Sequence, residues 1–296
     1  MKIKRILIPT DFSETAQLAV AHGAYMAHLF KAKVFLLHAI EAEVYAMLPE
    51  SALVMEIEPP QEHVVERLSS VAEDIVKKYD IELSTLTVNG KPAKGIAAAV
   101  KENGIDIVIM GTHGAGGFEE FFVGSNTHRV VTLAPCPVLS IQKFAKKVGF
   151  SNIIMPIDST LHSRQKINNV IALATAYESN VHILGLLEKD NEEADEKKFK
   201  IKLDSVEDRL IHANIPFTKK LVRGDNLAVE AMNYSKEVKG DLIVIMSDHE
   251  SKLTGIFMGA YAQQIVNHSR IPVLSIKPEE TTIETFDLTG GTGVII

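Results

Sequence analysis

The stretch Asp106-Ile107-Val108-Ile109-Met110-Gly111-Thr112-His113-Gly114-Ala115-Gly116-Gly117-Phe118-Glu119-Glu120-Phe121-Phe122-Val123-Gly124-Ser125 decides how the rest of the chain is interpreted. Residues 106–110 are mostly apolar and β-branched, which predicts a buried strand. Between residues 126 and 133 the apolar side chains recur at helical spacing. The stretch therefore predicts a strand, a glycine-rich loop and the beginning of a helix.

The predicted loop has the chemistry of a phosphate cradle. Gly111 and Gly114 allow the backbone to turn sharply and to approach a ligand closely. Gly124 and Ser125 fall where the helix begins, and free N–H groups and the helix dipole attract phosphate there. The pattern is neither a Walker A loop nor GxGxxG. From the glycines alone, a turn without any ligand is an equal alternative.

The spacing Gly-x-x-Gly, nine residues and Gly-Ser resembles the nucleotide-binding pattern of the universal stress protein family. Further motifs of the first half resemble the same family: residues 6–13, 36–39, 90–92 and 134–139. The resemblance implies flavodoxin-like (Rossmann-like) α/β domains, each with a five-stranded parallel sheet and helices on both faces. It also implies an ATP site.

Composition limits the class of protein. The chain has 296 residues, of which 46% are hydrophobic, enough for two domains of ordinary size. A net charge of −7 without a basic stripe argues against nucleic acid as a partner. Cys136 is the lone cysteine, and no apolar run approaches a membrane span. We therefore expect a cytoplasmic protein that has no membrane partner.

Strand and helix patterns alternate through the first half. The predicted strands are 4–10, 34–39, 83–88, 106–110 and 137–141, separated by helices from 13 or 14, from 61 to 79, from 91 to 101 and from 126 to 133. Residues 41–60 are predicted to be a long loop, either a lid or an insertion. This order predicts a parallel, doubly wound sheet.

The pattern then repeats, which predicts two domains in tandem. Residues 152–158 echo residues 5–11, and residues 181–186 echo the second strand. We predict domains at 1–145 and 151–278, a linker at 144–151 and a flexible tail at 279–296. Family members often pair their last strands edge to edge, so 137–141 and 272–276 are expected to pair within this chain, leaving other surfaces for any homo-oligomer.

Residues 106–141 align without a gap on residues 241–276. In that register both loop glycines are lost: Gly111 becomes Met246, Gly114 becomes His249, Gly117 becomes Lys252, Ser125 becomes Ala260, and Gly124 is retained as Gly259. Shifting the loop by one residue matches Ser247 and Glu250 with the glycines instead. Either register predicts that the second domain has lost phosphate binding, because side chains replace glycines and a carboxylate repels phosphate.

Asp11 follows the first strand, whose end Pro9 stiffens. Ligands of open α/β sheets bind beyond the carboxyl ends of the strands, where a carboxylate suits ribose hydroxyls. Alternatively, Asp11 caps the following helix. Asp158 repeats this residue in the half that lost the cradle, which adds weight to capping, while ligand binding by Asp11 is still the favoured interpretation.

By resemblance, the positions of Ala39 and Met110 lie against adenine, and those of Gly114, Gly124, Ser125 and Asn126 hold phosphates. His113 either contacts phosphate or is incidental, since no base or metal partner is identifiable. The candidate nucleotide-binding residues are Pro9, Thr10, Asp11, Ala39, Met110, Gly111, His113, Gly114, Gly124, Ser125 and Asn126.

Three classes of function are left open: a nucleotide-dependent stress-response module, a slow ATPase, and an interaction scaffold without nucleotide. No catalytic set and no protein metal site is legible, so ATP is expected to bring Mg²⁺ or Mn²⁺ held by its phosphates and water. The first class is favoured.

Overall fold

The computed structural model describes residues 2–40, 60–112, 124–160, 162–190, 192–247, 249–252 and 255–279. The first half of the chain alternates strands and helices in the predicted order. Its elements are β1 (Arg5–Pro9), α1 (Glu14–Phe30), β2 (Lys33–Ile40), α3 (Pro60–Tyr79), β3 (Leu83–Asn89), α4 (Pro92–Asn103), β4 (Ile107–Gly111), α5 (Ser125–Leu133) and β5 (Val138–Ile141).

The second half repeats this order with one addition. Its elements are β6 (Asn152–Ile157), the 3-10 turn η2 (His162–Arg164), α6 (Ile167–Tyr177), β7 (Asn180–Glu188), α7 (Glu193–His212), β8 (Phe217–Gly224), α8 (Leu227–Glu237), β9 (Leu242–Met246), β10 (His249–Lys252), β11 (Gly255–Met258), α9 (Ala260–His268) and β12 (Val273–Ile276). The antiparallel hairpin β10–β11 was not predicted, because the sequence indicated only an altered loop there.

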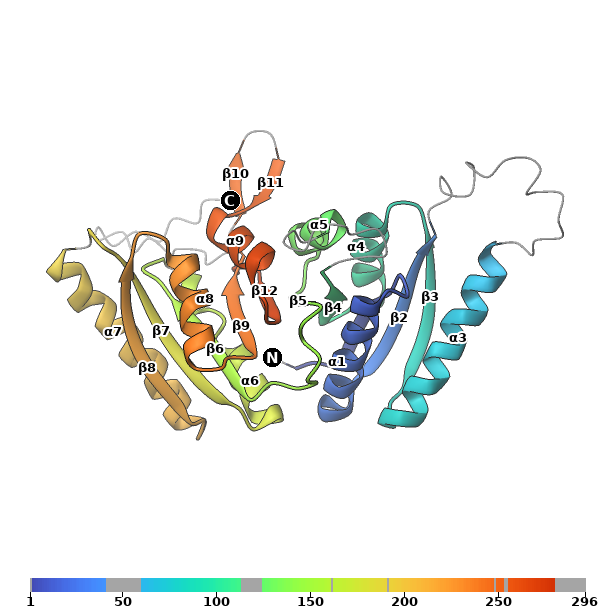
Figure 1. Ribbon diagram of the computed structural model, residues 1–296, viewed down its shortest axis with the longest axis horizontal. Helices are drawn as coiled ribbons and strands as arrows, with labels where there is room; N and C mark the ends of the chain where they lie inside the picture. The colour runs from blue at the N-terminus through green and yellow to red at the C-terminus, as the bar shows by residue number, and fades with distance from the viewer. Residues whose placement is uncertain are drawn as a thin grey trace, which may run out of the picture.

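All strands except this hairpin join one ten-stranded sheet, in the order β3-β2-β1-β4-β5-β12-β9-β6-β7-β8 (Figure 1). Within each half the five strands are parallel, which confirms the predicted α/β class. Parallel strands buried on both faces are apolar throughout, as the runs 107–110 and 242–246 show.

The two halves meet at an antiparallel pair between β5 and β12. Leu139 lies opposite Leu274, and Val138 lies opposite Ser275. The Ser140 hydroxyl donates to the Val273 carbonyl oxygen across this junction at 3.1 Å. The predicted pairing of the two last strands within one chain is therefore confirmed.

Two apolar layers cover the sheet, one on each face. One layer lies under α1, α3, α6 and α7, and the other lies under α4, α5, α8 and α9. Each layer contains buried residues from both halves, so the core is continuous across the β5–β12 junction.

The predicted linker at 144–151 packs against the helices as well as joining the two halves. Phe150 is buried, stacks on His22 with ring centroids 5.5 Å apart and tilts against Tyr177 at 5.1 Å. His22 Nε2 lies 3.0 Å from the Ala145 carbonyl oxygen, so this nitrogen donates. The predicted linker is thus fastened to α1.

Two predicted segments fall largely outside the described residues. These are the loop at 41–60, except Pro60 at the first position of α3, and the tail at 279–296, except Glu279. The backbone N–H of Glu279 donates to the Gln165 side chain at 2.9 Å.

Candidate functional site

The candidate site of the first half is the crevice between the carboxyl ends of β1 and β4. The chain runs from β1 outward to β2 on one side, and β4 with β5 lies on the other. Ile6 pairs with Ile107 and Leu7 with Val108, so Pro9, the last residue of β1, lies level with Met110, the residue before the end of β4. This is the switch point at which open α/β sheets bind ligands.

The turn after β1 is fixed by its own side chains. The Thr10 hydroxyl accepts from the Phe12 N–H at 3.0 Å, and the Asp11 carboxylate accepts from the Ser13 N–H at 3.1 Å. The residue that caps α1 is Ser13, whose hydroxyl accepts from the Ala16 N–H at 3.2 Å. The alternative that Asp11 caps the helix is therefore wrong, because the helix begins two residues later than that role requires.

Phe12 and its neighbours are a feature that the sequence analysis missed. Phe12 has a φ of +63°, a strained value for a residue other than glycine, and its ring stacks on His38 at 4.8 Å. The Arg67 guanidinium of α3 lies over the same ring at 4.3 Å. His38 Nδ1 donates to the Thr10 carbonyl oxygen at 2.8 Å, which ties β2 to this turn. An aromatic residue between Asp11 and Ser13 was the available signal.

Gly111 is needed for a reason that the sequence did not indicate. A Cβ atom at this position would lie 3.0 Å from the backbone carbon and oxygen of Thr15, in the first turn of α1. Such contacts are tighter than nearly all real Cβ contacts, so the glycine lets α1 approach the end of β4 closely. The close approach seen at Gly111 is to a helix of the same chain, and the approach of this backbone to a ligand stays a prediction.

Two threonines that were not predicted hold the ends of the loop. The carbonyl oxygen of Thr112 accepts from the Gly124 N–H at 2.7 Å, and the Thr112 hydroxyl donates to Ile141 at 3.3 Å. The Thr127 hydroxyl donates to the Gly111 carbonyl oxygen at 2.9 Å. Polar side chains on the buried face of α5 were the signal for Thr127. These bonds bring the beginning of α5 to the end of β4.

The beginning of α5 agrees with the prediction. Gly124 is the N-terminal cap, Ser125 is the first helical residue and no side chain caps the helix. Its first turn contains no acidic residue, so nothing there repels an anion. A Cβ atom on Gly124 would lie 3.1 Å from the Thr112 oxygen, which makes glycine the best fit. Ser125 is exposed, and Asn126 is half-buried.

The remaining candidates lie on the neighbouring strands. Met110 is buried near the end of β4, and Ala39 is half-buried near the end of β2. The crevice thus brings together Pro9, Thr10, Asp11, Ala39, Met110, Gly111, Gly124, Ser125 and Asn126 at one edge of the sheet. His113 and Gly114 lie outside the described residues.

The equivalent crevice of the second half is built differently. α6 begins at Ile167, and η2 lies next to the ends of β6 and β9. Met246, at the position of Gly111, is buried in the layer under α6 and α7. The Met246 side chain therefore points into the core and not into the crevice.

Polar atoms in the second crevice are left without partners. Ser247, at the position of Thr112, and Tyr261, at the position of Asn126, each have a buried hydroxyl without a hydrogen bond. Burial raises the pKa of the Tyr261 hydroxyl, with a smaller contribution from the charge of Asp158. Among the residues that the structure describes, no group of three His, Cys, Asp or Glu side chains could hold a metal ion.

Comparison with known proteins agrees with the repeated architecture. The sequence model of the Universal stress protein family matches residues 2–142 and again residues 149–277. The chain belongs to the universal stress protein family. No helix in the described ranges is both long and apolar enough to cross a membrane.

Individual relatives match about half of this chain. The universal stress protein MJ0577 of Methanocaldococcus jannaschii is 31% identical over 154 residues, which is 47% of this chain and 95% of that protein. MJ0531 of the same organism is 30% identical over 145 residues, 49% of this chain and 85% of that protein.

One solved structure matches the whole arrangement. A universal stress protein from Archaeoglobus fulgidus superimposes with a TM-score of 0.70 at 16% identity, covering 94% of this chain and 99% of that chain. At this identity the likeness concerns the fold, which is the flavodoxin-like fold predicted for this chain.

Proposed function

We propose that this universal stress protein binds ATP in the crevice of its first half and acts as a nucleotide-dependent stress-response module. One observation carries the proposal: α5 opens onto the β1–β4 crevice with a glycine cap, no side-chain cap and no acidic residue in its first turn. A helix end of this kind binds phosphate well, since its N–H groups and dipole both favour negative charge. The sequence Gly-x-x-Gly, nine residues and Gly-Ser leads directly into it.

The neighbouring residues are suited to bind the adenine and the ribose of the nucleotide. In the proposed arrangement, Ala39 and Met110 contact adenine, and the exposed Asp11 carboxylate accepts from the ribose hydroxyls. Gly114, Gly124, Ser125 and Asn126 hold the phosphates. Pro9, Thr10 and Gly111 shape the crevice, and His113 lies within the same loop.

We propose that Mg²⁺ or Mn²⁺ accompanies the nucleotide, bound by phosphate oxygens and water. Calorimetric titration of nucleotide-free protein with Mg²⁺ tests this. We expect little heat without ATP, and tight metal binding by the protein alone would contradict the proposal.

The direct experiment is to purify the protein, denature it and identify any released nucleotide, followed by titration of the emptied protein with a labelled ATP analogue. Released ATP and one site per chain support the proposal. Released ADP with measurable turnover supports the alternative of slow hydrolysis. A protein that carries no nucleotide and binds none in the titration overturns the proposal and favours an interaction scaffold.

We also propose that the repeat corresponds to two domains, 1–145 and 151–278, in a cytoplasmic protein. Cys136 is the lone cysteine of the sequence, so no intrachain disulfide forms, which suits a reducing compartment. Cell fractionation tests the location, and a membrane fraction would contradict it.

A further inference from the structure

The two ends of the ten-stranded sheet are β3 and β8. In the described part of the chain, each of them pairs with a single neighbour, β2 or β7. Each therefore presents a row of backbone groups outward, and such edges pair with other strands unless the protein blocks them. The two edges differ in how they are protected.

The β8 edge is charged and crossed by ion pairs. Lys219 forms ion pairs with Asp204 and Glu207 of α7, and Lys220 pairs with Glu237 at 2.7 Å. Arg223 pairs with Glu196 at the beginning of α7. Charged side chains, especially lysines, are a common protection of edge strands. An incoming strand would have to displace these pairs.

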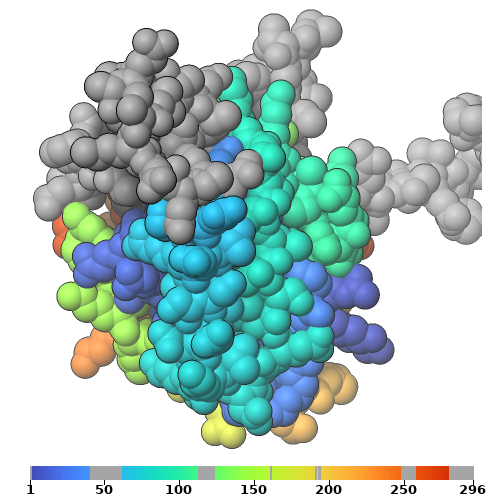
Figure 2. All heavy atoms as spheres, turned by 90° about the vertical axis from the view of Figure 1, so that its right-hand side faces the viewer, coloured from blue at the N-terminus to red at the C-terminus, as the bar shows by residue number. Residues whose placement is uncertain are grey.

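The β3 edge carries no charge. Its sequence, Leu83-Ser84-Thr85-Leu86-Thr87-Val88-Asn89, contains neither an acidic nor a basic residue. Thr85 and Thr87 are exposed, while Leu86 and Val88 are half-buried. Figure 2 looks onto this end of the molecule, where α3 in cyan lies beside β3 and α4 in teal. Threonines and β-branched residues favour strand pairing.

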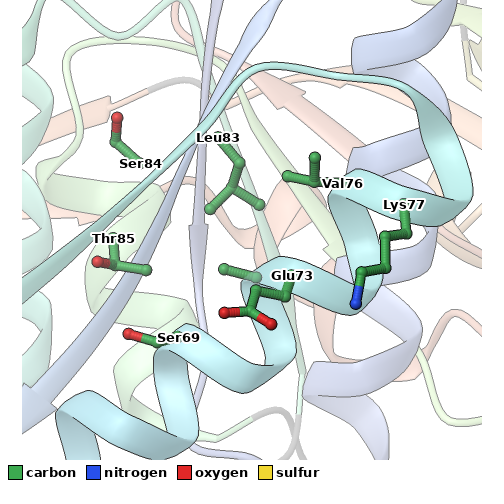
Figure 3. A pocket seen from close by; sticks show the side chains of 8 residues that line it. Ser69, Glu73, Val76, Lys77, Leu83, Ser84 and Thr85 are labelled. Atoms are coloured by element: carbon green, nitrogen blue, oxygen red, sulfur yellow. The ribbon is translucent and has the colours of Figure 1, made fainter.

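A groove runs beside this edge, between α3 and β3. Its volume is about 630 Å³, and it is lined by Ser69, Ala72, Glu73, Val76, Lys77, Leu83, Ser84 and Thr85. Figure 3 shows Glu73 and Lys77 on α3 facing the strand side of the groove, with Val76 beside them. Val76 is 39% exposed, so an apolar strip accompanies the strand.

Glu73 and Lys77 are the charged residues of this groove. They lie one helical turn apart, yet no ion pair is found for either of them among the described residues. A surface with one acid and one base a turn apart is complementary to its own copy after a twofold rotation. An axis passing between the two positions puts each Glu73 opposite the partner's Lys77.

We propose that β3 pairs antiparallel with β3 of a second copy of this chain, about a twofold axis perpendicular to the sheet. This rotation leaves α3 of both copies on the same face, so that their Val76 side chains and reciprocal charges meet above the joined strands. The chain already contains such a junction at β5–β12, where Tyr25 of α1 and Tyr177 of α6 meet on one face with centroids 5.8 Å apart. The proposal does not depend on nucleotide binding.

The first test measures the mass of the full chain by sedimentation and light scattering across a concentration series. We expect a reversible dimer of the 32.5 kDa chain. Thr85→Lys should weaken association at least tenfold, because the exposed Thr85 lines the groove beside Glu73 and Lys77, close to the axis, and two like charges would meet there across the strand pair. Thr175→Lys adds the same charge at an exposed threonine of α6, outside the edge, and should have no effect.

The second test reverses the charges of the groove. Glu73→Lys and Lys77→Glu should each weaken the dimer, and the double variant should restore it, since it exchanges the two members of each reciprocal pair. Circular dichroism and thermal unfolding check that every variant is folded.

A wild-type chain that stays monomeric up to its highest soluble concentration overturns the proposal. A dimer that Thr85→Lys leaves unchanged places the contact elsewhere and also overturns it. Single reversals that weaken the dimer without recovery in the double variant contradict the twofold arrangement.

Discussion

The two halves of this protein have nearly the same strands but differ where β4 and β9 end. In the first half, Gly111 lies against the first turn of α1, which has 17 residues. In the second half, Met246 replaces the glycine and α6 has 11 residues. Both helices end at equivalent residues, Phe30 and Tyr177, each followed by a left-handed cap. The difference is therefore at the N-terminal end, where the 3-10 turn η2 lies beside β6 and β9 and Met246 stands in place of the glycine.

The polar bonds of the loop differ in the same way. Thr127 fastens α5 to the Gly111 carbonyl oxygen, whereas Ala262 at the matching position of α9 has no hydroxyl. α5 and α9 are nevertheless equally long, with nine residues each, and both have a glycine cap. The second half therefore lacks the Thr127 bond and the glycine of the first crevice while it keeps the same scaffold.

The largest effect is expected from a double variant that makes the first crevice resemble the second. Gly114→Glu with Ser125→Ala should lower ATP affinity by about a hundred- to ten-thousandfold, because a carboxylate repels phosphate and a charged hydrogen bond is lost. Equilibrium titration with a labelled ATP analogue measures this change. Ala260→Ser is the matched control, and it should leave a single site with unchanged affinity. Two equivalent sites per chain, or full binding by the double variant, would refute the assignment.

The next largest effect is a loss of stability at the close approach of α1 to β4. Gly111→Ala places a Cβ atom 3.0 Å from the Thr15 backbone, so the first turn of α1 must move. We expect the free energy of unfolding to fall by about 1–3 kcal/mol, as for other overpacked sites. Urea unfolding followed by circular dichroism measures it. Met246→Leu conserves volume at the matching position and should cost less than about 1.5 kcal/mol. Unchanged stability of Gly111→Ala would show that this contact is relaxed in solution.

A smaller effect is expected at the hydrogen bond that the second half lacks. Thr127→Ala removes the 2.9 Å bond to Gly111 and gives α5 the alanine of α9. The free energy of unfolding should fall by about 0.5–1.5 kcal/mol, the net contribution of one such bond. Thr175→Ala is the control, since its hydroxyl donates to the Ile171 carbonyl oxygen of its own exposed helix. If the free energy of unfolding falls by the same amount in both variants, the bond between Thr127 and Gly111 stabilises the fold no more than a bond within one exposed helix.

The smallest effect is a pH dependence due to His22, a histidine that the matching helix of the second half lacks. Burial lowers the pKa of His22, although its bond to the Ala145 carbonyl and the charge of Asp241 act in the opposite direction. The folded pKa is thus below the unfolded value of about 6.5, so the unfolded chain binds the proton first. Its contribution to stability is complete above that pH and is lost as the pH falls, with a slope of at most about 1.4 kcal/mol per pH unit.

His22→Gln should make the stability less dependent on pH below the unfolded value, because the amide does not titrate. Unfolding at a series of pH values measures the slope. Asn169 occupies the matching position of α6, and Asn169→Gln should leave the slope as it is in the wild type. If the slope is unchanged in His22→Gln, the imidazole of His22 reaches solvent before it binds the proton, and the prediction is contradicted.

Much of the fold and part of the site could be predicted from the sequence. Apolar runs such as 107–110 and 242–246, the cap at Gly124 and the gapless repeat are local or periodic features, and these follow from steric and hydrophobic preferences along the chain. The positions of helix boundaries depend more on distant contacts. The capping residue after β1 was Ser13 and not Asp11, because the Asp11 carboxylate is taken into the preceding turn.

The sequence by itself determined the alternation of strands and helices in each half, the place of the glycine-rich loop and the family. Only the tertiary structure decided that Gly111 makes room for Thr15, that Phe12 stacks between His38 and Arg67, and that Met246 turns into the core. It alone decided that β3 and β8 lie at the two ends of one ten-stranded sheet in the described part of the chain. These features depend on residues far apart in the chain, and local preferences carry no information about which distant side chain arrives at a given position.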